Sequence, residues 1–345
     1  MACPTAASRL IQLETAFGFD TKSLRGHRKL LMTEFAYFSS APPNPATVVK
    51  AFISVSPFGY RVLDEPIDGP PPEQVAALLR NHVGRDYRLA ASGRQALDLI
   101  LAALNLAPDD VISIITTSGS DYVSNCVTST VELHCRWSMK LESATRAVIA
   151  IHEWGRPCER IVEVQGQGIP VIEDCAYAFA TRYADGSKVG SKGDYALFSL
   201  SKMFSVNFGG VLVAPDGELP LAPLCQEHEA DLLTRIGPEL SRLPEVVSAR
   251  RAVWSDLAER FSDLGAPPYF DPMPGEEPSV LMFHHDPARV PLAEVRKRFD
   301  QHGIEASIFY GSDAFYVPAH QRLGPASRAF MAEIYRSLLA DWNER

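Results

Sequence analysis

Three short apolar runs between Ile169 and Ala214 constrain the fold of this chain more than any other feature. The first run reads IPVIED and ends at Asp174, the second leads into SLSK and ends at Lys202, and the third covers Gly209–Ala214. Short continuous runs of this kind are typical of strands buried on both faces of a parallel sheet. Because α/β proteins bind ligands at the carboxyl ends of such strands, Asp174 and Lys202 lie where chemistry is expected.

This pair of residues indicates pyridoxal 5'-phosphate (PLP) as a cofactor. PLP needs a lysine amine for its Schiff base and a carboxylate for its pyridinium nitrogen, and Lys202 and Asp174 offer these groups. Ser199, three residues before Lys202 at the end of the second apolar run, is a candidate hydroxyl donor to the cofactor phosphate. Taken singly, Asp174 is explained as a helix cap and Lys202 as a solvated surface residue. The ordered set of strand ends favours PLP.

The motifs of this stretch are similar to those of a known family. They are VIEDCAYA from Val171, KVGSKGD from Lys188, FSLSK from Phe198, and the pair Gly209-Gly210. The stretch resembles the DegT/DnrJ/EryC1/StrS family of PLP-dependent aminotransferases, most of which act on nucleotide-linked keto sugars. The resemblance runs from about Val62 to Pro215 and more loosely to Gly324.

The resemblance implies fold type I, with a mainly parallel, doubly covered α/β sheet followed by a smaller C-terminal α+β domain. The alternation of strands and helices between Tyr87 and Val213 also predicts such a sheet. We expect an N-terminal helical extension (1–60), a PLP-binding large domain (61–215) and a small C-terminal domain (216–345). The resemblance further implies a homodimer in which Lys202 is the catalytic acid and base and Asp174 stabilises the protonated ring nitrogen.

A phosphate site is predicted where a strand at Tyr87–Ala91 runs through Ser92, Gly93 and Arg94 into a helix at Gln95–Leu106. Backbone N–H groups and the helix dipole favour an anion at such a helix start. The family has S-G-T at this point, so Arg94 replaces the Thr and adds a cation. The alternative is an ordinary Ser N-cap without a ligand.

Four further residues are candidates for the site through the resemblance. Tyr122 is the nearest aromatic residue to the position that stacks on the cofactor ring, although an ungapped alignment places Ser120 there. Tyr177 replaces the usual Gln of the family and is expected to face the cofactor. His152, in a family-like H-x-x-G element, and Tyr316, near the family's substrate entrance, are candidate substrate contacts; a lone His is also common as a structural residue.

The regions outside this stretch carry weaker patterns. Helical spacing before residue 61 predicts a packing extension or dimer contact, with a lid over the site as the alternative. The expected helices are Ser8–Phe17, Ser23–Phe38, Thr47–Ile53, Gln74–Val83, Tyr122–Val131, Ile161–Gly166, Pro244–Leu264 and Leu292–His302, and the expected later strands are Ser279–His284 and Ile304–Tyr310.

Composition argues against several other classes of protein. A net charge of −9 disfavours a nucleic-acid-binding surface, which needs clustered Lys and Arg. No apolar run reaches the roughly 20 residues of a membrane span, and the N-terminus does not resemble a secretory signal. Six scattered cysteines without C-x-x-C spacing give no zinc or other metal motif. We therefore expect a cytoplasmic protein with reduced thiols, a small-molecule substrate and an amino donor.

The sequence leaves the reaction open among three hypotheses. The first is an aminotransferase that moves an amino group from an amino acid to a keto acceptor, such as a nucleotide-linked keto sugar or a natural-product intermediate. The second keeps PLP but makes the protein a lyase, a racemase or a C–C bond-forming enzyme, because Tyr177 is altered and the family's substrate-facing segments after Pro215 are not recognisable. The third is a non-catalytic PLP-fold binding protein, against which the intact Asp174 and Lys202 argue.

Overall fold

The protein is built around a seven-stranded sheet. The computed structural model describes residues 53–59, 62, 65–215 and 224–343, so the helices expected before residue 53 lie outside it. In the order β1-β7-β6-β5-β4-β2-β3, the strands are Tyr87–Ala90, Gly210–Val213, Tyr195–Ser199, Val171–Asp174, Thr145–Ile151, Val111–Thr116 and Arg136–Ser138. Neighbours are parallel except at β7, which is antiparallel to β1 and β6. The expected mainly parallel sheet is confirmed.

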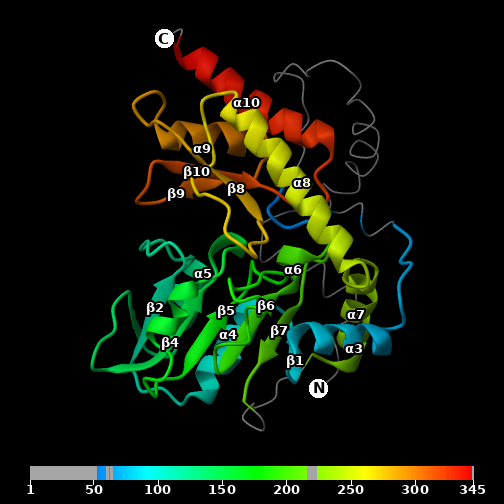
Figure 1. The fold of residues 1–345 in the computed structure, drawn as a ribbon, viewed down its shortest axis with the longest axis vertical. Helices are drawn as coiled ribbons and strands as arrows, with labels where there is room; N and C mark the ends of the chain where they lie inside the picture. The colour runs from blue at the N-terminus through cyan, green and yellow to red at the C-terminus, as the bar shows by residue number, and fades with distance from the viewer. Residues whose placement is uncertain (1–52, 60–61, 63–64, 216–223, 344–345) are drawn as a thin grey trace, which may run out of the picture. The chain divides into compact units, whose positions relative to one another are not determined.

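Both faces of this sheet are covered by helices (Figure 1). Successive residues of β5 enter different apolar clusters, with Val171 on one side and Ile172 on the other. The helices that contribute to the Val171 cluster include α3 (Pro72–Val83) and α7 (Gln226–Leu240), and those that contribute to the Ile172 cluster are α4 (Gly93–Ala103) and α5 (Asn125–Val131). Burial on both sides explains why these strands are continuously apolar.

A second, smaller sheet follows in the C-terminal part of the chain. It is antiparallel, in the order β8-β10-β9, with strands Val280–His284, Ala314–Pro318 and Ser307–Phe309. Its helices are α8 (Leu243–Ser262), α9 (Leu292–Gln301) and α10 (Pro325–Asn343). Phe261 of α8, Phe283 of β8 and Tyr335 of α10 join these elements through ring contacts of 4.6–5.5 Å between centroids. Helix α8 extends from α7 to this sheet (Figure 1).

Several elements differ from the sequence expectations. The helix expected from Tyr122 begins only at Asn125, and the helix expected over 161–166 is a short 3₁₀ turn, η4 (Glu159–Glu163). The strand expected from Ile304 is reduced to β9, and β3, β10, α7 and α10 are among the elements that were not predicted. On α3, helical spacing places Val75, Leu78 and Leu79 on one apolar face, but only Val75 and Leu79 of these three are buried and Leu78 is 37% exposed. Among the described helices, none combines the length and apolar composition that crossing a membrane requires.

Candidate active site

Asp174 lies at the carboxyl end of β5, as expected. Strands β5 and β6 are parallel neighbours, and the N–H of Cys175 donates to the Leu197 carbonyl at 2.9 Å, so both strands end at the same edge. The Asp174 side chain is 6% exposed, and its Oδ1 accepts a hydrogen bond from the Ala176 N–H at 2.9 Å. Burial raises the pKa of this carboxyl. Within the described residues no Lys or Arg pairs with it, so a cationic ligand would be its natural partner.

Lys202 follows β6 directly, on the single-turn helix α6 (Leu200–Met203). Its Nζ lies 5.2 Å from the centroid of the Tyr177 ring, which places Tyr177 beside the amine. Two other lysines of the same motif region are held elsewhere. Lys188 Nζ donates to the carbonyls of α3 at its C-terminal end, and Lys192 Nζ pairs with Asp185 at 3.0 Å. Of these three lysines, Lys202 is therefore the one that the fold leaves at the strand ends.

The Ser92–Gly93 turn and Ser199 come together at the start of α4. Ser92 is the N-cap, and its Oγ accepts from the Gln95 N–H at 3.1 Å. A Cβ on Gly93 would lie 3.1 Å from the Ser199 Cβ, and one on Gly210 would collide with the Ser92 carbonyl. These glycines let the turn and the two strands approach closely, so the N–H groups that α4 leaves without intrahelical partners lie beside Ser199.

The Arg94 side chain is exposed and contacts a residue that the sequence patterns did not single out. Its guanidinium donates to the Cys126 Sγ at 2.8 Å, near the start of α5. Burial opposes ionisation of this thiol, but hydrogen bonds from Arg94 and Ser124 lower its pKa below the usual value overall. The positive charge of Lys202 acts in the same direction. The positive charges of Arg94 and Lys202 thus both act on the Cys126 thiol.

Aromatic side chains surround Tyr177 and continue outward from the strand ends. The Trp154 ring lies 4.9 Å from that of Tyr177 and 4.5 Å from that of Tyr316. The Tyr122 ring lies 5.3 Å from that of Phe309 on β9. The structure thus gathers the three tyrosines expected near the site. Sequence reasoning missed Trp154. The structure gives it a left-handed backbone (φ 58°), a conformation that few non-glycine residues adopt and that the sequence does not reveal.

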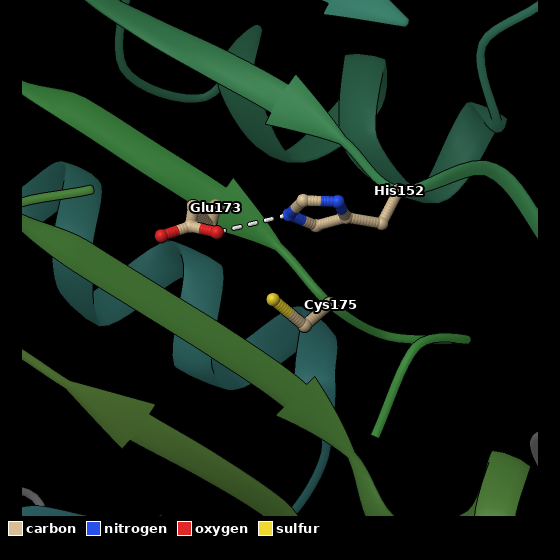
Figure 2. Close-up of side chains that lie close together, drawn as sticks. All are labelled: His152, Glu173 and Cys175. Carbon is tan, nitrogen blue, oxygen red and sulfur yellow. Dashed lines mark hydrogen bonds and ion pairs between the residues drawn. The ribbon is translucent and has the colours of Figure 1, made fainter. Parts of the chain in front are cut away.

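His152, by contrast, is buried behind the strand ends in the cluster that Figure 2 shows with Glu173 and Cys175. The His152 Nδ1 accepts from the Cys158 N–H at 2.9 Å, so its Nε2 must carry the proton that it donates to Glu173 at 3.0 Å. Both ring nitrogens are occupied within the protein, which favours the structural alternative over the candidate substrate contact. The Sγ of Cys175 lies in the same cluster, which has the spacing of a metal site.

Hydrogen bonds to Glu173 argue against a metal in this cluster. Its carboxylate accepts from His152, Tyr183 and the N–H groups of Gly190, Lys192 and Gly193. Burial alone would raise the pKa of Glu173, but these donors lower it to about 2. Since donors already fill the acceptor positions of the carboxylate, the cluster holds the KVGSKGD loop against β5 instead.

These features together define the fold class. A mainly parallel sheet that carries an aspartate and a lysine at neighbouring strand ends has the architecture of PLP-dependent fold type I transferases. Residues 136–225 match the DegT/DnrJ/EryC1/StrS aminotransferase family, which confirms the resemblance seen in the sequence.

Individual relatives agree with this assignment. The chain is 31% identical over 159 residues to the GDP-perosamine synthase of Escherichia coli O157:H7, covering 41% of this chain and 43% of that protein. The alignment therefore spans less than half of either protein. The crystal structure of DesI with its TDP-sugar product has the same fold, with a TM-score of 0.66 and 16% identity over 91% of this chain and 98% of that one. The structure of the protein Spr1654 from Streptococcus pneumoniae in its PLP form also has this fold. It superposes with a TM-score of 0.61 at 15% identity, over 80% of this chain and 92% of that one.

Proposed function

We propose that this protein is a PLP-dependent aminotransferase that moves an amino group from an amino-acid donor to a keto acceptor. The observation that carries the proposal is the placement of Asp174 and Lys202 at the ends of adjacent parallel strands, with the Ser92 turn beside Ser199 at the same edge. The acceptor class we propose is a nucleotide-linked keto sugar, because one relative is named for such a substrate, a UDP-linked 3-dehydro sugar, and others are named for, or were solved with, nucleotide-linked sugar products.

The side chains present fit PLP on chemical grounds. Asp174 is a buried carboxylate that lacks a basic partner among the described residues, and a protonated ring nitrogen would supply one. The N–H groups of Gly93 and Arg94 at the start of α4, with the Ser199 hydroxyl, suit a phosphate dianion. When bound, PLP supplies an electron sink for the substrate carbon that loses its proton.

The chain's own residues would then have distinct tasks. Lys202 would bind the cofactor covalently and, once released, move the proton of the substrate as acid and base. Asp174 would keep the ring nitrogen protonated. Tyr122 and Tyr177, which flank Trp154, would exclude water and orient the ring and the substrate, with Tyr316 on the substrate side.

The setting of the enzyme is also part of the proposal. We infer a homodimer in the cytoplasm that acts on small molecules, does not bind nucleic acid and is not inserted in a membrane. The family resemblance supports the dimer. The net charge of −9 supports the absence of a nucleic-acid partner, and the free Cys135, Cys158 and Cys175 suit a reducing compartment.

Borohydride trapping tests the central residue. Protein incubated with PLP and reduced should carry the cofactor on the peptide that contains Lys202, as read by mass spectrometry. Lys202→Ala should not be labelled, whereas the matched control Lys192→Ala should be labelled like the wild type. Label on the Lys202→Ala protein, or none on the wild type, would refute the assignment. An amino donor alone should convert bound PLP to its pyridoxamine form, and its failure to do so would favour a lyase, a racemase or C–C bond formation.

A further inference from the structure

The single-turn helix that carries Lys202 ends in carbonyl groups that it cannot satisfy itself. A helix leaves its last four carbonyls without intrahelical donors, and α6 has only four residues. The Leu200 carbonyl accepts from the Phe204 N–H at 2.8 Å, which closes the turn. The next three carbonyls all receive side-chain donors from segments far away in the sequence. Ser56 Oγ donates to the Ser201 carbonyl at 2.6 Å.

Arg250 provides the donor for Lys202 itself. From α8, its Nη2 donates to the Lys202 carbonyl at 2.6 Å and to the Met203 carbonyl at 3.3 Å. Its Nε donates to the Gln321 Oε1 at 2.8 Å, and the Gln321 Nε2 donates to the same Met203 carbonyl at 2.9 Å. Arg250 and Gln321 thus form a closed set of hydrogen bonds around the end of α6.

The burial of Arg250 makes this arrangement unusual. Arg250 is 1% exposed, and burying a guanidinium is costly unless its N–H groups find acceptors. Burial lowers its pKa to about 10, so the group remains charged at neutral pH. A positive charge at the C-terminal end of a helix is also favourable for the helix dipole. A smaller apolar side chain would fill this place at less cost if packing were the sole requirement.

The set is anchored on its far side as well. Glu239 of α7 accepts from the Gln321 Nε2 at 2.8 Å and from the Ser205 N–H at 2.7 Å, just after α6. Arg322 donates to the Ser205 Oγ at 3.0 Å. The backbone of the turn that carries Lys202 is therefore held by α7, α8 and the segment after β10.

We propose that Arg250 is a positioning residue, which with Gln321 fixes the backbone of Lys202 so that its amine meets the cofactor in the reactive orientation. This inference rests on the proposed function, because it takes Lys202 as the lysine that binds PLP. Arg250 acts through the main chain of α6 and has no contact with the reacting atoms. Its single guanidinium reaches two carbonyls and the Gln321 amide, which a lysine ammonium cannot match in geometry.

Two ligands separate positioning from general damage. Pyridoxamine phosphate cannot form the covalent link, so its binding reports the cofactor site without Lys202. Arg250→Met should bind it within about twofold of the wild type, since the phosphate and ring contacts remain. Borohydride trapping of PLP on Lys202 should be slower by about tenfold or more, because small displacements of a reacting group cause losses of that size. Arg250→Lys should recover part of the rate.

The controls use the same helix and the same network. Arg260→Gln changes an α8 arginine that pairs with Asp256 at 3.0 Å and whose side chain is 37% exposed, and this variant should trap PLP at the wild-type rate. Gln321→Leu removes one donor to the Met203 carbonyl and should slow trapping, but less than Arg250→Met does. This second variant tests the inference even if the Arg250→Met protein fails to fold. Unchanged trapping in the folded variants would overturn the inference, and so would an equal loss of pyridoxamine phosphate binding. Absence of any label on wild-type Lys202 would instead refute the proposed function.

Discussion

The carboxylate of Glu173 should contribute more to folding stability than any single surface ion pair among the described residues. Glu173 is wholly buried and accepts five hydrogen bonds, three of them from N–H groups of the loop between Gly190 and Gly193. Glu173→Gln keeps the shape of the side chain but turns one oxygen into a donor. Because one oxygen serves two donors and the other serves three, at least two donors lose their acceptor in either amide orientation.

Two independent estimates give the size of the effect. The pKa of Glu173 is about 2 in the folded protein against a reference of 4.5, which corresponds to about 3 kcal/mol of stability at neutral pH, at about 1.4 kcal/mol per pKa unit. Two buried donors without acceptors cost about 1–3 kcal/mol each, or roughly 2–6 kcal/mol together. The first value lies within the second range, so we expect Glu173→Gln to lower the free energy of unfolding by about 3 kcal/mol.

The pH dependence provides a sharper test than the size alone. A depressed folded-state pKa contributes stability that is fully present above 4.5 and is lost as the pH falls toward 2. The difference between wild type and Glu173→Gln should therefore shrink by about 1 kcal/mol between pH 7 and about pH 3.5 in urea titrations. The matched control Glu163→Gln removes an exposed pair with Arg160 and should cost less than about 0.5 kcal/mol. A Glu173→Gln cost under about 1 kcal/mol, or a difference that does not vary with pH, would refute this reasoning.

Two further predictions concern the cofactor site. Asp174→Asn should fold with an unchanged melting temperature without cofactor, because the side chain is nearly isosteric, yet lose most turnover, because an amide cannot hold the ring-nitrogen proton; unaltered turnover with PLP bound would remove Asp174 from the mechanism. Arg94→Ala should weaken PLP binding more than Ser199→Ala, by up to about 3 kcal/mol if its guanidinium leaves Cys126 for the phosphate, since charged hydrogen bonds are the stronger ones. Melting temperatures measured with excess PLP report the loss of PLP binding in Arg94→Ala and in Ser199→Ala. Equal PLP affinity in the wild type and Arg94→Ala would assign the phosphate to backbone N–H groups.

The strand ends were predictable because their signal is local in the sequence. An apolar run of four or five residues followed by Asp174 or Lys202 fixes both the strand and the edge where it ends. The role of Arg250 was not predictable in the same way. The helical spacing of apolar residues in the sequence favours Val247 as a core position of α8, whereas the structure buries Val246 and Arg250 and leaves Val247 partly exposed. Whether a charged side chain can be buried depends on acceptors that come from other segments, and the sequence of α8 does not contain them.

The neighbouring carboxylates of β5 show why residue type alone could not separate structure from chemistry. Side chains alternate along a strand, so Glu173 and Asp174 face opposite sides of the sheet although they are adjacent in the sequence. Glu173 meets five donors, which lower its pKa, while Asp174 has one backbone donor and burial raises its pKa. Pairs of acids whose surroundings move their pKa values apart have different tasks. The carboxylate of Glu173, whose acceptor positions are filled, holds the loop in place, and that of Asp174 remains open to a cation that the described part of the chain does not supply.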